Sequence, residues 1–178
     1  MRIGYEGYAN PITSIEITGT SITPKTGTTT ATGIECYQAD TTITGSVTLS
    51  DNVIQTPQRF TLAENGQIPS DTVLSSDLMP GVNTKGVTWT DNSDGWTLAI
   101  SESGSYKLTE SFNLKSMTIS KENVVIDGNG KTIIAVAGSG NRVITFSGEN
   151  SELKNLKVTS SAEFTKAGKI IELSLELS

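Results

Sequence analysis

Histidine is missing from this 178-residue sequence, and cysteine occurs once, as Cys36. The lack of histidine excludes Ser/His and Cys/His nucleophile systems, histidine-ligated zinc and the usual acid-base group of neutral pH. A single cysteine excludes an intrachain disulfide. No basic residue neighbours Cys36 in the sequence, so we expect a small buried hydrophobe rather than a reactive thiol.

Charged residues and long apolar runs are also scarce. Charged residues make up 18% of the chain and the net charge is −6, which argues against a nucleic-acid partner because such proteins need a basic surface. No apolar run approaches the length of a membrane span, and no apolar segment typical of a signal peptide follows Met1. Serine, threonine and glycine are abundant instead, as in all-β proteins.

The C-terminal part of the chain nearly repeats itself, and one further step of the repeat reaches Ile171 and Leu173. The period of about 27 residues is typical of solenoid repeats, and the alternation of apolar and polar residues inside each copy is that of strands. We therefore expect stacked parallel β-coils, with equivalent residues about 4.8 Å apart. The equivalent pairs are Met117 and Ile144, Ile119 and Phe146, Asn123 and Asn150, and Ile126 and Leu153.

The run from Asn123 to Ile133, together with the segments 96–108 and 117–122 before it, resembles the opening coils of a right-handed parallel β-helix of the pectin-lyase-like superfamily. The resemblance extends from Trp96 to the end of the chain. That superfamily includes polysaccharide lyases and hydrolases, adhesins and phage tailspikes. The resemblance therefore implies a fold and leaves the activity open.

The predicted fold class is all-β, with three segments. Residues 1–13 show no period and are expected to form an N-terminal arm. Residues 14–84 contain short alternating segments separated by turn clusters, which we interpret as a β-sandwich-like anchoring domain. Residues 85–178 are expected to form a capping hairpin followed by the first two to three coils of the β-helix.

Two tryptophans and a tyrosine are the aromatic candidates for a site. Trp89 and Trp96 lie in the hairpin predicted over residues 87–100, each on the face that carries its apolar neighbours. We expect the two tryptophans to plug the first coil. The alternative is an exposed platform that stacks on sugars, and for this Trp89, Trp96 and Tyr106 are the candidate glycan contacts.

The sequence predicts no catalytic residue, no cofactor site and no metal site. A glycosidase needs two carboxylates at a fixed separation, but the glutamates of the repeat are scattered along the predicted ladders and Asp127 lies in a turn. Residues 91–95 lack the spacing of a calcium loop, and Gly138-Ser-Gly140 lacks the third glycine of a dinucleotide site. The chain is therefore predicted not to be an enzyme, unless its chemistry lies beyond Ser178.

The last residues predict an interaction between protomers. Apolar residues alternate with polar ones at the end of the chain, and an exposed strand edge can pair with another chain. We expect a homo-oligomer, either a trimer or a filament, or contact with other assembly proteins; a truncated longer β-helix is the alternative. The candidate inter-protomer residues are Ile171, Leu173, Leu175 and Leu177.

These features lead to a hypothesis about function. The chain is interpreted as a non-catalytic structural or attachment subunit of a virion, such as a tail fibre, spike or decoration protein, or of a cell-surface assembly. It would lie in a virion or outside the cell, with a surface glycan as a candidate partner. The alternative is the N-terminal part of a secreted polysaccharide lyase or glycoside hydrolase, or a glycan-binding adhesin.

Overall fold

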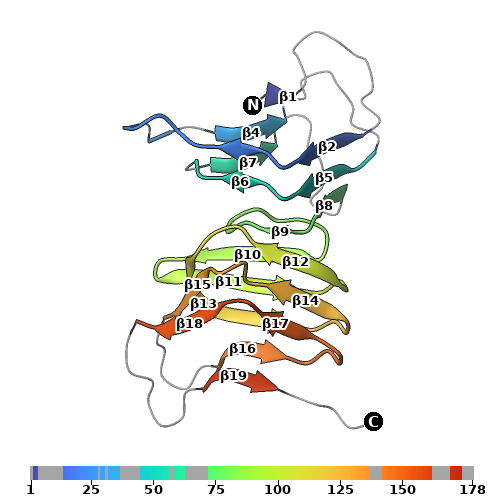
Figure 1. Ribbon diagram of the computed structural model, residues 1–178, viewed down its shortest axis with the longest axis vertical. Coiled ribbons are helices and arrows are strands. Elements are labelled where there is room, and N and C mark those ends of the chain that lie inside the picture. The colour runs from blue at the N-terminus through green and yellow to red at the C-terminus, as the bar shows by residue number, and fades with distance from the viewer. Residues whose placement is uncertain are drawn as a thin grey trace. The chain divides into compact units, whose positions relative to one another are not determined.

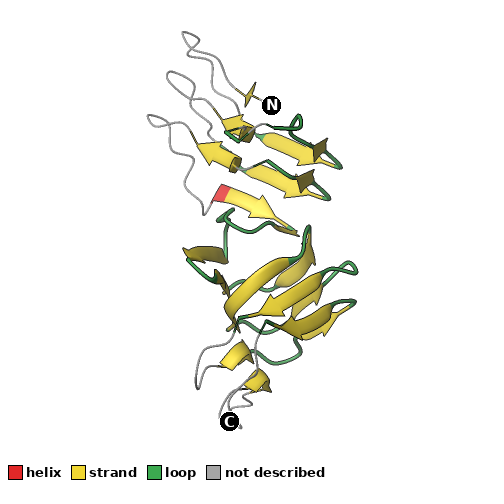
Figure 2. Ribbon diagram, turned by 90° about the vertical axis from the view of Figure 1, so that its left-hand side faces the viewer, coloured by secondary structure: helices red, strands yellow, loops and turns green. Residues whose placement is uncertain are grey.

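The computed structural model shows an all-β protein, as predicted (Figure 2). It describes residues 2–3, 14–27, 29–30, 32–36, 45–56, 58–62, 72–136, 142–161 and 169–173. The chain divides into two compact units, Met1–Asp77 and Leu78–Ser178, which are called unit 1 and unit 2 below. The boundary expected at residue 84 thus lies inside unit 2.

Unit 1 consists of short strands, and every described pairing joins a strand in parallel to the third strand after it. One sheet has the order β1-β4-β7, a second β2-β5-β8, and the third contains β3 and β6. The strands are β1 (Arg2–Ile3), β2 (Ile15–Thr18), β3 (Ser21–Ile22), β4 (Thr32–Cys36), β5 (Val47–Ser50), β6 (Val53–Ile54), β7 (Gln58–Leu62) and β8 (Val73–Ser75), and β9 (Asp77–Leu78) lies at the division between the units.

The register of unit 1 does not confirm the sandwich-like arrangement expected for residues 14–84. Ile15 pairs in parallel with Val47, and Val47 pairs in parallel with Val73 after a shorter interval of sequence. The sheets of the common sandwich folds are antiparallel, whereas every described pair of strands in this unit is parallel. Alternating residues and turn clusters occur in both arrangements, so the local pattern did not reveal which strands pair.

The first residues of the chain also differ from expectation. Arg2 and Ile3, predicted to belong to an arm, pair in parallel with Glu35 and Cys36. The rest of the predicted arm up to residue 13 lies outside the described residues. Cys36 is placed in a strand, and its predicted burial and lack of reactivity stay predictions.

Unit 2 continues after β9 with further strands, and the chain passes through them in repeated turns (Figure 1). The strands are β10 (Val87–Asn92), β11 (Gly95–Ile100), β12 (Gly104–Leu108), β13 (Phe112–Ile119), β14 (Val124–Asp127), β15 (Thr132–Ala135), β16 (Arg142–Phe146), β17 (Glu152–Lys154), β18 (Lys157–Ser160) and β19 (Lys169–Leu173).

Three columns of parallel strands run through unit 2. The first column contains β11, the C-terminal half of β13, β16 and β19. The second contains β12, β14 and β17, with β9 at the other side of β12. The third contains the N-terminal half of β13, β15 and β18. Each turn of the chain therefore adds one strand to each column.

The register predicted from the sequence repeat is confirmed. Met117 pairs with Ile144, and Ile144 pairs with Ile171. The second column has the same step from β14 to β17, and there the Val124 N–H donates to Ser151 Oγ, 27 residues further along the chain. The third column departs from this step, because Ile133 pairs with Val158, which follows after a shorter interval.

The predicted hairpin forms over Val87–Ile100, where β10 and β11 pair antiparallel. The outer edge of β10 is covered by the segment just before it. Thr84 and Val87 exchange backbone hydrogen bonds, both 3.0 Å long. The Trp89 N–H donates to Asn83 Oδ1 at 2.6 Å. These contacts satisfy backbone groups that an edge strand would otherwise present to another chain.

One continuous apolar core fills unit 2. The inward residues of each column lie above one another, as Leu98, Met117 and Ile144 do in the first column. All three are almost completely buried, and burial of each such side chain stabilises the fold by about 1.5–3 kcal/mol. Burial at the other end of the core is weaker, since Leu153, Leu156 and Val158 are only partly buried.

Asparagines in the left-handed conformation shape the turns of unit 2. Asn123 and Asn150, predicted to be equivalent, have φ angles of 57° and 52° and lie in successive turns. The Asn123 N–H donates to the Glu149 carbonyl at 2.9 Å, which links the two turns. Asparagine tolerates this region better than other residues with a Cβ. Their equivalence is therefore confirmed in the backbone, while both side chains are exposed.

Candidate functional site

The two tryptophans meet in the interior of unit 2. Trp89 is only 5% exposed, and its ring lies edge-on to those of Trp96 and Phe112, with centroids 6.0 and 5.2 Å away. Trp96 is partly buried and lies against Gly81, where an added Cβ would come within 3.0 Å of its ring. This arrangement agrees with the plug that the sequence favoured over a sugar platform.

Tyr106, the third candidate glycan contact, is also buried, with 6% of its surface exposed. Its hydroxyl donates to the Glu102 carbonyl at 3.0 Å. Burial raises the pKa of this phenol, and the nearby Glu102 charge raises it further. A ring that stacks on a sugar must present a face to solvent. The rings of Trp89 and Tyr106 both belong to the core, which argues against a glycan contact at these two residues.

Two of the four candidate inter-protomer residues lie in β19, and the other two follow it in the sequence. Ile171 and Leu173 lie in this strand, which pairs in parallel with β16 of the same chain. Leu175 and Leu177 lie outside the described residues. In the described part of the chain, β16 is the strand paired with β19. Pairing of β19 with another protomer stays a prediction.

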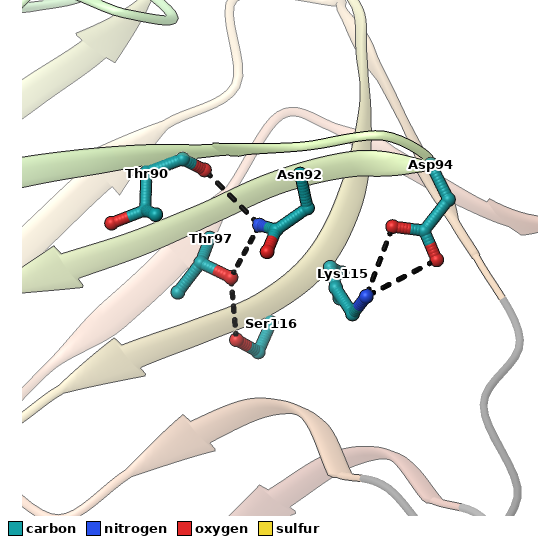
Figure 3. Close-up of polar contacts among 6 residues, drawn as sticks. All are labelled: Thr90, Asn92, Asp94, Thr97, Lys115 and Ser116. Atoms are coloured by element: carbon teal, nitrogen blue, oxygen red, sulfur yellow. Dashed lines mark hydrogen bonds and ion pairs between the residues drawn. The ribbon is translucent and has the colours of Figure 1, made fainter.

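A β-bulge places two consecutive polar residues of β13 near the end of the hairpin. Trp96 pairs with Leu114 but Thr97 pairs with Ser116, so Lys115 is the extra residue. Bulges re-aim side chains in this way. Lys115 Nζ bonds to both carboxylate oxygens of Asp94, at 3.1 and 3.3 Å (Figure 3). Both side chains are roughly half exposed, so this ion pair contributes little to stability.

Beside this ion pair, three polar side chains form a chain of hydrogen bonds across β10, β11 and β13 (Figure 3). Asn92 Nδ2 donates to the Thr90 carbonyl at 3.2 Å and to Thr97 Oγ1 at 3.1 Å. Ser116 Oγ donates to the same Thr97 oxygen at 3.3 Å. Asn92 and Asp94, from the segment compared above with a calcium loop, therefore have protein partners. Among the described residues, no group of three or more metal-binding side chains occurs.

The outer face of the same sheet carries rows of small residues that the sequence analysis did not identify. The strand register places side chains of β10, β11, β13 and β16 next to one another in two rows without a charged residue, and Thr145 pairs in turn with Glu172 of β19. We call them the hydroxyl rows. One row is Thr88, Ala99, Thr118 and Thr145, and the other is Thr90, Thr97 and Ser116. Sequence reasoning could not find them, because β11 and β13 pair over an interval that is not part of the sequence repeat.

Asp127 serves turn geometry, as predicted from its position. Its Oδ1 accepts the Asn129 N–H at 2.8 Å and the Asn155 side-chain amide at 3.3 Å. The hydrogen bond from Asn129 lowers the pKa of this carboxyl, and the Asn155 amide and the charges of Lys154 and Lys107 lower it further. A carboxylate held in its ionised form near lysines of adjacent strands suits a structural tie better than a general acid.

Unit 1 contains a buried polar pair that the sequence analysis missed. Asn52 and Asp77 are 1% and 4% exposed. The Asp77 carboxylate accepts the Asp51 and Asn52 N–H groups, both at 2.8 Å, and the Asn52 side-chain amide at 3.1 Å. Asn52 also donates to the Ile17 carbonyl at 2.9 Å and accepts the Thr20 N–H at 3.0 Å. The pair, called the turn clamp below, thus joins three successive turns.

Burial raises the pKa of the Asp77 carboxyl, although the N–H groups of Asn52 and Asp51 and the Asn52 amide act in the opposite direction. A perturbed carboxyl can mark a catalytic site. Here each carboxylate oxygen already accepts hydrogen bonds from the protein, and Asn52 is equally buried. The clamp therefore has the geometry of a structural element.

The remaining carboxylates of the repeat lie at the surface. Glu122, Glu149 and Glu152 are exposed, and Glu152 lies 3.8 Å from Lys154. The part of the chain that the structure describes also contains no helix with the length and apolar character needed to span a membrane.

Comparison of the chain with protein-family models, with curated proteins and with solved structures finds no match.

Proposed function

We propose that this chain is a non-catalytic structural or attachment subunit of a virion or cell-surface assembly, built as part of a right-handed parallel β-helix. The observation that supports the proposal is the register of unit 2, where Met117, Ile144 and Ile171 follow one another in adjacent parallel strands. A column of this kind stabilises itself through contacts between neighbouring coils. It offers outer surfaces and strand edges for contact with partners.

The distribution of polar side chains supports a structural role. The buried clamp, the Asp127 turn and the hairpin chain around Thr97 all bond to the protein itself. Between β10 and β16 the hydroxyl rows carry no charged residue, which suits contact with a protein or a neutral glycan. In a tail fibre, spike or decoration protein such a surface would contact a partner, and the chain would lie in a virion or at a cell surface.

The partner expected first is a second copy, and the test is the mass of the 178-residue chain in solution. Light scattering across a concentration series should show a stable trimer or a growing filament. A monomer at every concentration would contradict the assembly role. It would favour the alternative function, the N-terminal part of a secreted polysaccharide lyase or glycoside hydrolase.

Proline variants at two adjacent positions of β19 test whether this strand forms the contact between copies of the chain. Because the N–H groups of consecutive strand residues point to opposite sides, Ile171→Pro and Glu172→Pro remove donors on opposite edges of β19. One variant should weaken pairing with β16, detected as faster hydrogen exchange in residues 142–146. The other should leave that exchange unchanged and abolish the oligomer. If both variants keep the full mass, β19 is not the contact.

A glycan partner is tested separately by quenching of tryptophan fluorescence with acrylamide. Trp89 is buried and Trp96 partly buried, so weak quenching is expected, with no change when neutral polysaccharides are added. Strong quenching that a polysaccharide suppresses would revive the adhesin alternative.

A further inference from the structure

We draw no further inference here: the strongest candidate, the partly buried apolar row of Leu153, Leu156 and Val158 around β17 and β18 in unit 2, carries nothing because nothing in the structure shows what covers it.

Discussion

Units 1 and 2 both contain parallel strands whose successive turns are linked by backbone hydrogen bonds, but unit 1 also links its turns through a buried carboxylate. In unit 2 backbone pairs link the turns, such as Asn123 N–H to the Glu149 carbonyl and Gly128 N–H to the Lys154 carbonyl, and a serine hydroxyl, Ser151 Oγ, accepts the Val124 N–H. In unit 1 the Asp77 carboxylate receives the N–H groups of Asp51 and Asn52. A side-chain carboxylate thus accepts N–H groups that a backbone carbonyl could otherwise accept.

The difference follows the spacing of the strands. From β13 and β14 onward, the first two columns of unit 2 advance by one constant step, as from Met117 to Ile144 and from Ile126 to Leu153, so equivalent turns meet with matching backbone groups. The strands of unit 1 advance by unequal steps, from Ile15 to Val47 and then to Val73, so the turns differ in length. At the turns of unit 1 the buried Asp77 carboxylate satisfies backbone donors, so this unit depends on individual polar residues.

Removal of the clamp carboxylate should have the largest effect. Asp77→Leu removes the acceptor of the buried Asn52 N–H, of the part-buried Asp51 N–H and of one of the two amide hydrogens of Asn52, and each such loss costs about 1–3 kcal/mol. We expect unit 1 to lose about 3–5 kcal/mol of unfolding free energy. Hydrogen exchange should accelerate in residues 47–56 and stay unchanged in residues 112–135. The exposed Asp91→Leu serves as the control, and equal acceleration in both units would refute the local role of the clamp.

A comparable test of unit 2 compares a glycine that lies where two turns approach closely with a glycine that has open space around it. A Cβ on Gly148 would overlap the Lys121 carbonyl oxygen, whereas a Cβ on Gly130 would meet no atom within 4 Å. Gly148→Ala should therefore cost about 2–3 kcal/mol through forced separation of the turns. Gly130→Ala should cost only about 1 kcal/mol, for its left-handed φ of 70°.

Urea unfolding followed by tryptophan fluorescence measures both glycine variants, since Trp89 and Trp96 both belong to unit 2. Equal losses in the two variants would mean that backbone conformation, rather than the distance between turns, limits these positions.

The left-handed asparagines should give a smaller effect. Asn123 has a φ of 57° and an exposed side chain, and its N–H bonds to the next turn. Asn123→Ala should cost about 1 kcal/mol because alanine tolerates this conformation poorly, while Asn123→Gly should be nearly neutral. Thermal unfolding of the two variants distinguishes these outcomes. A large loss in the glycine variant would instead show that the asparagine side chain itself stabilises the turn.

The contributions of Asp77 and Asp127 to stability should change with pH in opposite directions. Since the pKa of Asp77 is raised above 3.8, the folded state holds its proton more tightly than the unfolded chain does. The contribution of Asp77 to stability therefore rises as the pH falls through the raised pKa toward 3.8. The pKa of Asp127 is lowered, so its contribution is present above 3.8 and is lost as the pH falls through the lowered pKa.

Urea unfolding at a series of acidic pH values measures how the free energy of unfolding changes with pH in the wild type and in Asp127→Asn. Unfolding of unit 2 is followed by tryptophan fluorescence. In the Asp127→Asn variant, the stability of this unit should fall less as the pH is lowered. Hydrogen exchange in residues 47–56, corrected for its intrinsic pH dependence, reports unit 1. Loss of protection there as the pH falls toward 3.8 would contradict the sign derived for Asp77.

Much of unit 2 could be predicted because its signal is local and periodic. The pairing of Met117 with Ile144, the hairpin and the burial of Trp89 all follow from alternation, spacing and turn residues. The bulge at Lys115 and the hydroxyl rows could not be predicted, because they depend on the pairing of β11 with β13, whose interval differs from that of the repeat. The turn clamp could not be predicted either, because asparagine and aspartate are common in turns and nothing in the sequence indicates that Asn52 and Asp77 meet.

The sequence by itself determined the all-β class, the repeating register of unit 2 and the inward face of each of its strands, because side-chain alternation and a constant repeat are written along the chain. Tertiary structure alone decided that unit 1 pairs its strands in parallel and buries a carboxylate at their turns. Both features depend on which distant segments meet, and a strand with one apolar face can satisfy its hydrogen bonds with partners of either direction.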